Sequence, residues 1–126
     1  MEKKIIHTTN APAPIGPYSQ AIMAGSLLFI SGQIPINPLT NELVKSDIIA
    51  EAHQVMQNLK HILAHAGLDF PDVIKTTIFV TDLNHFSAVN DVYGKYFHQY
   101  FPARETVQVA ALPRGVNVEI SMIACK

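Results

Sequence analysis

Over residues 47–66, apolar side chains recur every three or four positions, and this period predicts an amphipathic helix. The apolar stripe consists of Ile48, Ala52, Val55, Leu59, Ile62 and Ala66. Either Ser46 or Asp47 can cap its first turn. Polar residues such as Glu51 and Asn58 fall outside the stripe. We therefore expect a helix with one face in the core and its polar side chains pointing away from it.

The same reading of the pattern predicts a second helix and six strands. From about His85 to Tyr100 large apolar residues share one side, and Pro102 ends the run. The expected strands cover residues 4–8, 21–24, 27–31, 73–80, 106–110 and 116–124. Residues 32–41 are rich in proline and asparagine, so we expect a loop there.

The resulting order, βββαβαββ, predicts a mixed sheet with both helices on one face. A helix between two strands favours parallel pairing, and hairpins favour antiparallel pairing. We expect the last two strands to form a hairpin. If it is symmetric, Val107 lies opposite Val118 and Thr106 lies opposite Glu119, so that the apolar sides agree.

This hairpin would place an arginine and a glutamate close together on the helix-free face. The Cβ atoms of Arg104 and Glu119 would be diagonal neighbours, about 7–8 Å apart. A guanidinium can bind a carboxylate through two hydrogen bonds, and a partly buried glutamate can act as an acid or base toward water. The plainer alternative is a cross-strand ion pair worth about 0.2–1 kcal/mol. Spacing alone leaves both interpretations open.

Composition narrows the class of protein. The 126 residues fit one domain, 1–126, and 48% hydrophobic residues with 15% charged ones exclude a disordered chain and favour an oligomer. A net charge of −1 without a basic stripe argues against nucleic-acid binding. With one cysteine, no apolar leader and no run of ~20 apolar residues, we expect a cytoplasmic protein that does not enter a membrane. His61 and His65 lack a third ligand, so we expect no metal site.

Several short motifs then stand in order along the chain. They are Gly16-Pro17-Tyr18-Ser19-Gln20-Ala21, Ser31-Gly32-Gln33-Ile34-Pro35, Val89-Asn90, Pro102-Ala103-Arg104, Leu112-Pro113 and Val118-Glu119-Ile120. Each motif is weak alone, but together they make the chain resemble the RidA/YjgF family of reactive-intermediate (enamine/imine) deaminases. The resemblance covers essentially the whole chain.

The resemblance implies an α+β, chorismate-mutase-like fold with a mixed six-stranded sheet and two helices packed on one face. It implies a homotrimer with its sites in clefts between subunits, and a reaction that uses no metal or cofactor. The implied reaction is hydrolysis of 2-imino acids, such as 2-iminobutanoate and 2-iminopropanoate, to 2-keto acids and ammonia. Pyridoxal-phosphate dehydratases acting on threonine and serine release such imines, so the role would be metabolite damage control.

Carried over by the same resemblance, Arg104 holds the substrate carboxylate and Glu119 positions or activates water. The other cleft positions match Tyr18, Ser31, Gly32, Asn90 and Thr106. The chain departs from the family at Thr106, where many bacterial members carry cysteine, and at Ser121, where a second glutamate is frequent. These two departures leave the substrate range open.

Three other functions compete with imine hydrolysis. The same cleft could bind a small carboxylate or keto acid as a regulator without turnover, although such binding needs the arginine and not the glutamate. RNA cleavage is attached to some relatives, but the near-neutral charge argues against phosphate-backbone binding. A holdase-type chaperone would use the apolar surface, which burial in a trimer explains more simply.

Overall fold

Six strands pair into one mixed sheet in the computed structural model, which describes residues 2–126. The strands are β1 (Lys3–Ile6), β2 (Ala21–Ala24), β3 (Leu27–Gln33), β6 (Val73–Val80), β7 (Ala103–Gln108) and β8 (Val118–Cys125). Their order across the sheet is β1-β2-β3-β8-β6-β7. Every neighbouring pair is antiparallel except β6 and β7, which run parallel. The predicted mixed six-stranded sheet is therefore confirmed.

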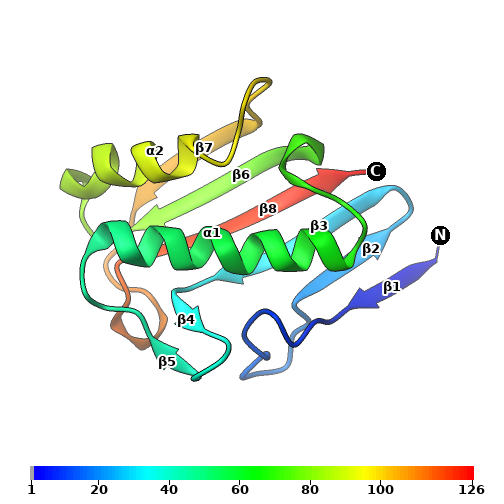
Figure 1. Ribbon diagram of the computed structural model, residues 1–126, viewed down its shortest axis with the longest axis horizontal. Coiled ribbons are helices and arrows are strands. Elements are labelled where there is room, and N and C mark those ends of the chain that lie inside the picture. Colours follow the sequence, from blue (N-terminus) through cyan, green and yellow to red (C-terminus); the bar gives the residue numbers. More distant parts are fainter. Residues whose placement is uncertain (1) are drawn as a thin grey trace.

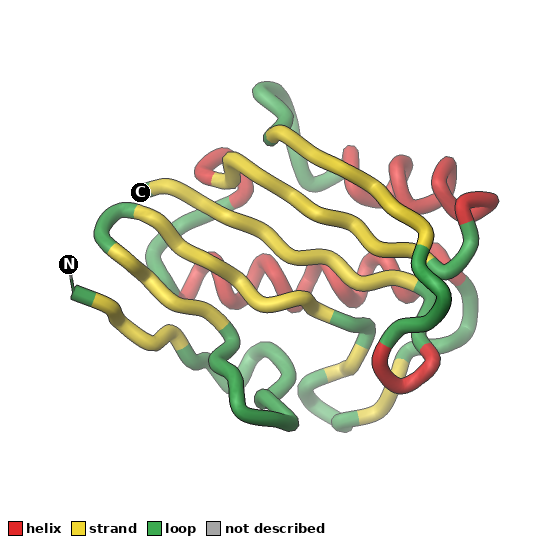
Figure 2. The backbone as a smooth tube through the Cα atoms, turned by 180° about the vertical axis from the view of Figure 1, so that it is seen from behind, coloured by secondary structure: helices red, strands yellow, loops and turns green. Residues whose placement is uncertain are grey.

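Both helices, α1 (Ile48–His65) and α2 (Phe86–Gly94), lie on the same face of this sheet (Figure 1). Seen from behind, the other face has no helix over it (Figure 2). The hydrophobic core lies between α1, α2 and the sheet, and its largest fully buried side chains include Leu28, Leu59, Ile78 and Ile120. The predicted layer arrangement is confirmed. No helix within residues 2–126 is long and apolar enough to cross a membrane.

The first helix forms where its pattern predicts. Asp47 caps it, and its carboxylate accepts a hydrogen bond from the Ala50 N–H at 2.8 Å. The expectation that Glu51 and Asn58 point away from the core is wrong, because both are buried. Asn58 donates to the carbonyls of Ile34 and Ile36, so α1 is covered by the segment after β3 as well as by the sheet.

Two loop and helix boundaries differ from the prediction. Residues 32–41 are not all loop, because β3 continues to Gln33 and a two-residue strand β4 (Ile36–Asn37) pairs with β5 (Glu42–Leu43). The second helix ends at Gly94 rather than near Tyr100. The aromatic residues that suggested a longer helix pack without one. Phe97 lies 5.4 Å from the Phe70 ring, between centroids.

The predicted hairpin of the last two strands is wrong. β7 and β8 do not pair with each other, because β6 lies between them. The crossover through α2 returns β7 parallel to β6, and the chain then passes through a short 3-10 turn at Pro113–Gly115 to reach the far side of β6. Glu119 is therefore registered with Phe79 and not with Thr106. Because β7 pairs with β6, its side chains point to the opposite faces from those predicted. Val107 therefore lies on the helix-free face.

Candidate active site

Glu119 is the second residue of β8 and lies on the sheet face that carries no helix. Its neighbours across the sheet are Phe79 on β6 and, beyond it, Val107 on β7. On its other side lies β3, whose pairing with β8 is interrupted by a register shift around Gly32. A Cβ at position 32 would lie 2.8 Å from Cδ of Glu119. The carboxylate thus occupies the space that a larger residue at Gly32 would fill.

The Glu119 carboxyl has no partner among residues 2–126. Burial raises the pKa of this half-buried group above its ordinary value. Across residues 2–126, no side chain forms an ion pair with it and no donor makes a hydrogen bond to it. Its oxygens are therefore free to accept hydrogen bonds from water or from a bound molecule.

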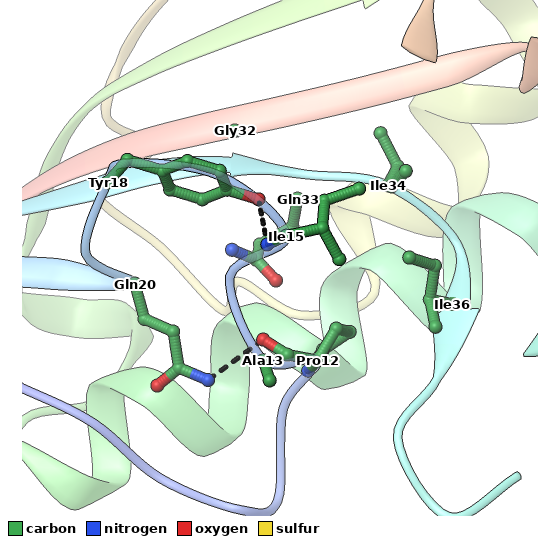
Figure 3. Close-up of a pocket in the computed structure, with 9 residues that line it drawn as sticks. All are labelled: Pro12, Ala13, Ile15, Tyr18, Gln20, Gly32, Gln33, Ile34 and Ile36. Atoms are coloured by element: carbon green, nitrogen blue, oxygen red, sulfur yellow. Dashed lines mark hydrogen bonds between the residues drawn. The ribbon is translucent and has the colours of Figure 1, made fainter. Parts of the chain in front are cut away.

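Tyr18 and Ser31 flank Gly32 on this side of the molecule. The Ser31 hydroxyl donates to the carbonyl of Ser19 at 2.6 Å, which ties β3 to the segment before β2. Tyr18 is half-exposed, and its hydroxyl accepts a 3.4 Å hydrogen bond from the Ile15 N–H. Tyr18 and Gly32 line one pocket together with the segments around them (Figure 3). We call Tyr18, Ser31, Gly32 and Glu119 the Glu119 cluster.

The fully buried amide of Gln20 holds the segment that carries Tyr18. Its Nε2 donates to the carbonyls of Thr8 and Pro12 at 3.0 and 2.9 Å. Its Oε1 accepts from the Thr8 N–H at 2.8 Å. A proline-rich loop with few backbone hydrogen bonds of its own is thereby fixed against the sheet edge. The position of Tyr18 is set by these bonds.

Arg104 lies on the opposite face of the sheet, under α2. It is registered with Thr76, whose hydroxyl accepts a 3.0 Å hydrogen bond from Tyr93 of α2. The Arg104 Cζ lies 5.1 Å from the ring centroid of Tyr93 and 5.6 Å from that of Phe86. No acceptor or carboxylate in the described part of the chain pairs with its guanidinium, and Glu105, the next residue on β7, pairs with Lys75 instead. All N–H donors of the Arg104 guanidinium are available to a ligand.

Asn90 and Thr106 belong to the same region as Arg104. Thr106 is two residues further along β7, on the same face, and its buried hydroxyl has no hydrogen-bond partner in the structure. Asn90 is half-buried on α2, one turn after Phe86 and one turn before Tyr93. We call Asn90, Arg104 and Thr106 the Arg104 cluster.

The predicted approach of Arg104 to Glu119 within one chain is therefore wrong. Arg104 faces α2, whereas Glu119 faces the helix-free side. Ser121 shares the Glu119 face but is registered with Thr77, two residues along β6. The candidate residues form two clusters on opposite sides of the sheet, and neither cluster contains both charged groups.

Sequence reasoning missed three side chains that support these clusters: Gln20, Phe86 and Tyr93. Phe86 and Tyr93 belong to the run of large apolar residues expected on one side of the second helix, and such a run usually indicates packing against the core. The spacing of Phe86, Asn90 and Tyr93 at i, i+4 and i+7 does place them on one side of α2. What the spacing could not reveal is that β7, and with it Arg104, lies beneath that side.

Comparisons with known proteins agree on one family. The family model described as Endoribonuclease L-PSP matches residues 8–126. A goat 2-iminobutanoate/2-iminopropanoate deaminase is 50% identical over 122 residues, covering 97% of this chain and 89% of the relative. The crystal structure of the Escherichia coli YjgF product has a TM-score of 0.94 and 48% identity, covering 98% of both chains. That of E. coli TdcF, which contains bound serine, has a TM-score of 0.94 and 45% identity, covering 98% of both chains.

Proposed function

The chain belongs to the RidA/YjgF family of imine deaminases, and we propose that it hydrolyses 2-imino acids such as 2-iminobutanoate and 2-iminopropanoate to 2-keto acids and ammonia. The observation that carries this proposal is that the two charged residues of the motifs have no partner in the described part of the chain. Arg104 and Glu119 are both half-buried, and neither has a hydrogen-bonding or ionic partner within residues 2–126. Partial burial of a charged group costs solvation free energy, and a protein partner usually offsets that cost. Charged groups without such a partner are suited to binding a ligand.

In this proposal Arg104 binds the substrate carboxylate through its paired N–H donors. Glu119 accepts a proton from a water molecule as the water oxygen bonds to the imine carbon. The same proton is delivered to the imine nitrogen, which gives a carbinolamine. The hydroxyl proton of this adduct then moves to the amine nitrogen, the C–N bond breaks to release ammonia, and the oxygen becomes the carbonyl of the 2-keto acid. The imine carbon is already electrophilic, so the protein contributes mainly by holding carboxylate and water in place.

We propose further that the working site is shared between subunits of a homotrimer. One chain holds Arg104 and Glu119 on opposite faces of the sheet, so the two groups can meet one substrate only if they come from different copies. The exposed helix-free face supports this assembly, since large apolar side chains such as Phe29 and Val107 are 44% and 41% exposed on it. One subunit would contribute Arg104 together with Asn90 and Thr106. Its neighbour would contribute Glu119 together with Tyr18, Ser31 and Gly32.

Two alternatives find less support. RNA cleavage would need a basic track for phosphates, and the chain has a net charge of −1 with the Arg104 guanidinium set among aromatic rings. A regulator that only binds a carboxylate has no use for the desolvated carboxyl of Glu119. We also propose that the protein works in the cytoplasm, where its one thiol, Cys125, is kept reduced.

The test is imine hydrolysis with and without the protein. A threonine dehydratase generates 2-iminobutanoate, and semicarbazide traps the imine that escapes hydrolysis. The wild-type protein should speed keto-acid release above the spontaneous rate, and Arg104→Ala should lose this effect by roughly a hundredfold or more while keeping its oligomeric state. If the wild-type protein gives no acceleration, the site binds without turnover; if Arg104→Ala keeps full activity, Arg104 is not the anchor.

A further inference from the structure

The guanidinium of Arg104 is held by two aromatic rings rather than by an acid. Its Cζ lies 5.1 Å from the Tyr93 ring centroid and 5.6 Å from the Phe86 ring centroid. A ring face attracts a cation without using its N–H donors, whereas a carboxylate partner would occupy them. Aromatic contact therefore keeps both the charge and the hydrogen-bonding fork of Arg104 available.

The Tyr93 ring is fixed in place. It is 4% exposed, its hydroxyl donates to Thr76 at 3.0 Å, and its centroid lies 4.8 Å from that of Phe97. Burial raises the pKa of Tyr93 above its ordinary value, so Arg104 meets a neutral ring and not a phenolate. Thr76 is also the β6 residue registered with Arg104. The hydrogen bond to Thr76 therefore fixes the Tyr93 ring next to Arg104.

The Phe86 ring is placed by a second link between α2 and β7. The turn that leads into α2 is bonded to the end of β7, where the Leu83 N–H donates to Gln108 Oε1 at 2.8 Å. Phe86 follows three residues later and is 40% exposed, so its ring lies at the border between the core and the surface. The first residue of α2 is thereby set against the same strand that carries Arg104.

We propose that Phe86 and Tyr93 are positioning residues for substrate recognition. Their rings hold the guanidinium of Arg104 on the face of β7 and direct its free donors toward the carboxylate of the 2-imino acid. This inference rests on the proposed function, and it assigns the two rings a role in carboxylate affinity beyond packing. An arginine side chain has many rotamers when exposed, so restricting them before the ligand arrives strengthens binding.

The test compares Phe86→Leu with Phe86→Tyr. Leucine removes the ring face and keeps an apolar side chain, and it should raise KM for 2-iminobutanoate about five- to tenfold with kcat within about twofold. Tyrosine keeps the ring face and should restore KM to within about twofold of wild type. Tyr93→Phe keeps the ring and loses only the hydroxyl, so it should lower Tm and leave KM close to the wild-type value. Tyr100→Leu, which removes an exposed aromatic residue that does not contact Arg104, is the matched control.

Binding of 2-oxobutanoate, measured by calorimetry on the same variants, gives a readout independent of turnover. The dissociation constant should rise for Phe86→Leu by the same factor as KM, and it should be unchanged for Tyr100→Leu. Equal KM and equal affinity in wild type and Phe86→Leu would overturn the positioning role, as would a Phe86→Tyr variant as impaired as Phe86→Leu. A wild-type protein that binds 2-oxobutanoate without hydrolysing imines would refute the proposed function and leave the positioning role to be judged by affinity alone.

Discussion

At the scale of single residues, the site depends on groups that are left without partners. Arg104 keeps its donors because rings hold it, and Glu119 keeps its acceptors because Gly32 leaves room beside it. A buried polar group normally finds a partner within the protein, since an unsatisfied one costs about 1–3 kcal/mol. Two such charged groups in one small chain mark the positions where a ligand supplies the missing partner.

The pKa of Glu119 should report on its neighbour in the assembly. In the single chain, burial raises this pKa, and no cation in the described part of the chain opposes the shift. If Arg104 of another subunit faces the carboxyl, its positive charge favours the ionised form and lowers the pKa. Removing that charge in Arg104→Ala should therefore raise the Glu119 pKa, as measured by NMR titration of carboxyl-labelled glutamate. A pKa that is the same in both proteins would mean that no Arg104 lies near Glu119.

Gly32→Ala should damage activity much more than stability. The added Cβ would collide with the carboxylate end of Glu119, a side chain that can move aside, and not with backbone. We expect kcat/KM to fall by roughly tenfold or more, with Tm changed by only a few degrees. Gly94→Ala is the control, because a Cβ there meets nothing within 4 Å. Equal activity in the two variants would show that the position of the Glu119 carboxylate is unimportant.

At the scale of elements, the helices were easier to predict than the strand partners. The 3.6-residue period and the Asp47 cap are local signals, and α1 follows them. The partner of β7 is a long-range choice that apolar alternation cannot decide, because a short strand such as 103–108 fits either neighbour. Only the crossover through α2 indicates a parallel partner, and the predicted hairpin instead assigns the last strand as the partner of β7.

Burial on more than one side of α1 also escaped the pattern. The helical period puts Glu51 outside the apolar stripe, but Glu51 is 1% exposed. It accepts hydrogen bonds from the Asn117 N–H at 2.9 Å and from Asn117 Nδ2 at 2.7 Å. Asn117 in turn accepts a hydrogen bond from the Thr81 hydroxyl at 3.2 Å. This small network joins α1 to the start of β8, two residues before Glu119. A helical period reports one apolar stripe and carries no information about polar contacts beside it.

Glu51→Ala should therefore destabilise the fold. It leaves two donors of Asn117 without an acceptor, at a cost of about 2–3 kcal/mol in the free energy of unfolding. Glu51→Gln retains one acceptor oxygen and should cost less. Urea denaturation at one protein concentration measures both. Glu42→Ala, which removes an exposed carboxylate on β5, should stay within about 0.5 kcal/mol of wild type. A loss in Glu51→Ala no larger than in this control would show that the network contributes nothing.

At the scale of the whole molecule, the fold explains why motif residues can be recognised in a sequence while their arrangement cannot. The motifs identify Tyr18, Gly32, Asn90, Arg104 and Glu119 without any knowledge of which face each occupies. The structure separates them into two clusters on opposite sides of one sheet. Within residues 2–126, no helix covers the face where Glu119 lies (Figure 2), and apolar side chains such as Phe29 and Val107 are exposed on it. A second copy of the chain placed there would both cover this surface and supply the missing cluster.

The most direct test of the shared site is to mix two inactive variants. Arg104→Ala and Glu119→Gln should each lose imine hydrolysis. When equal amounts are unfolded and refolded together, about one quarter of the interfaces should combine an intact Arg104 cluster with an intact Glu119 cluster, and about one quarter of wild-type activity should return. Each variant refolded alone should stay inactive. A mixture as inactive as its components would contradict the account, because it would mean that both groups act within a single chain.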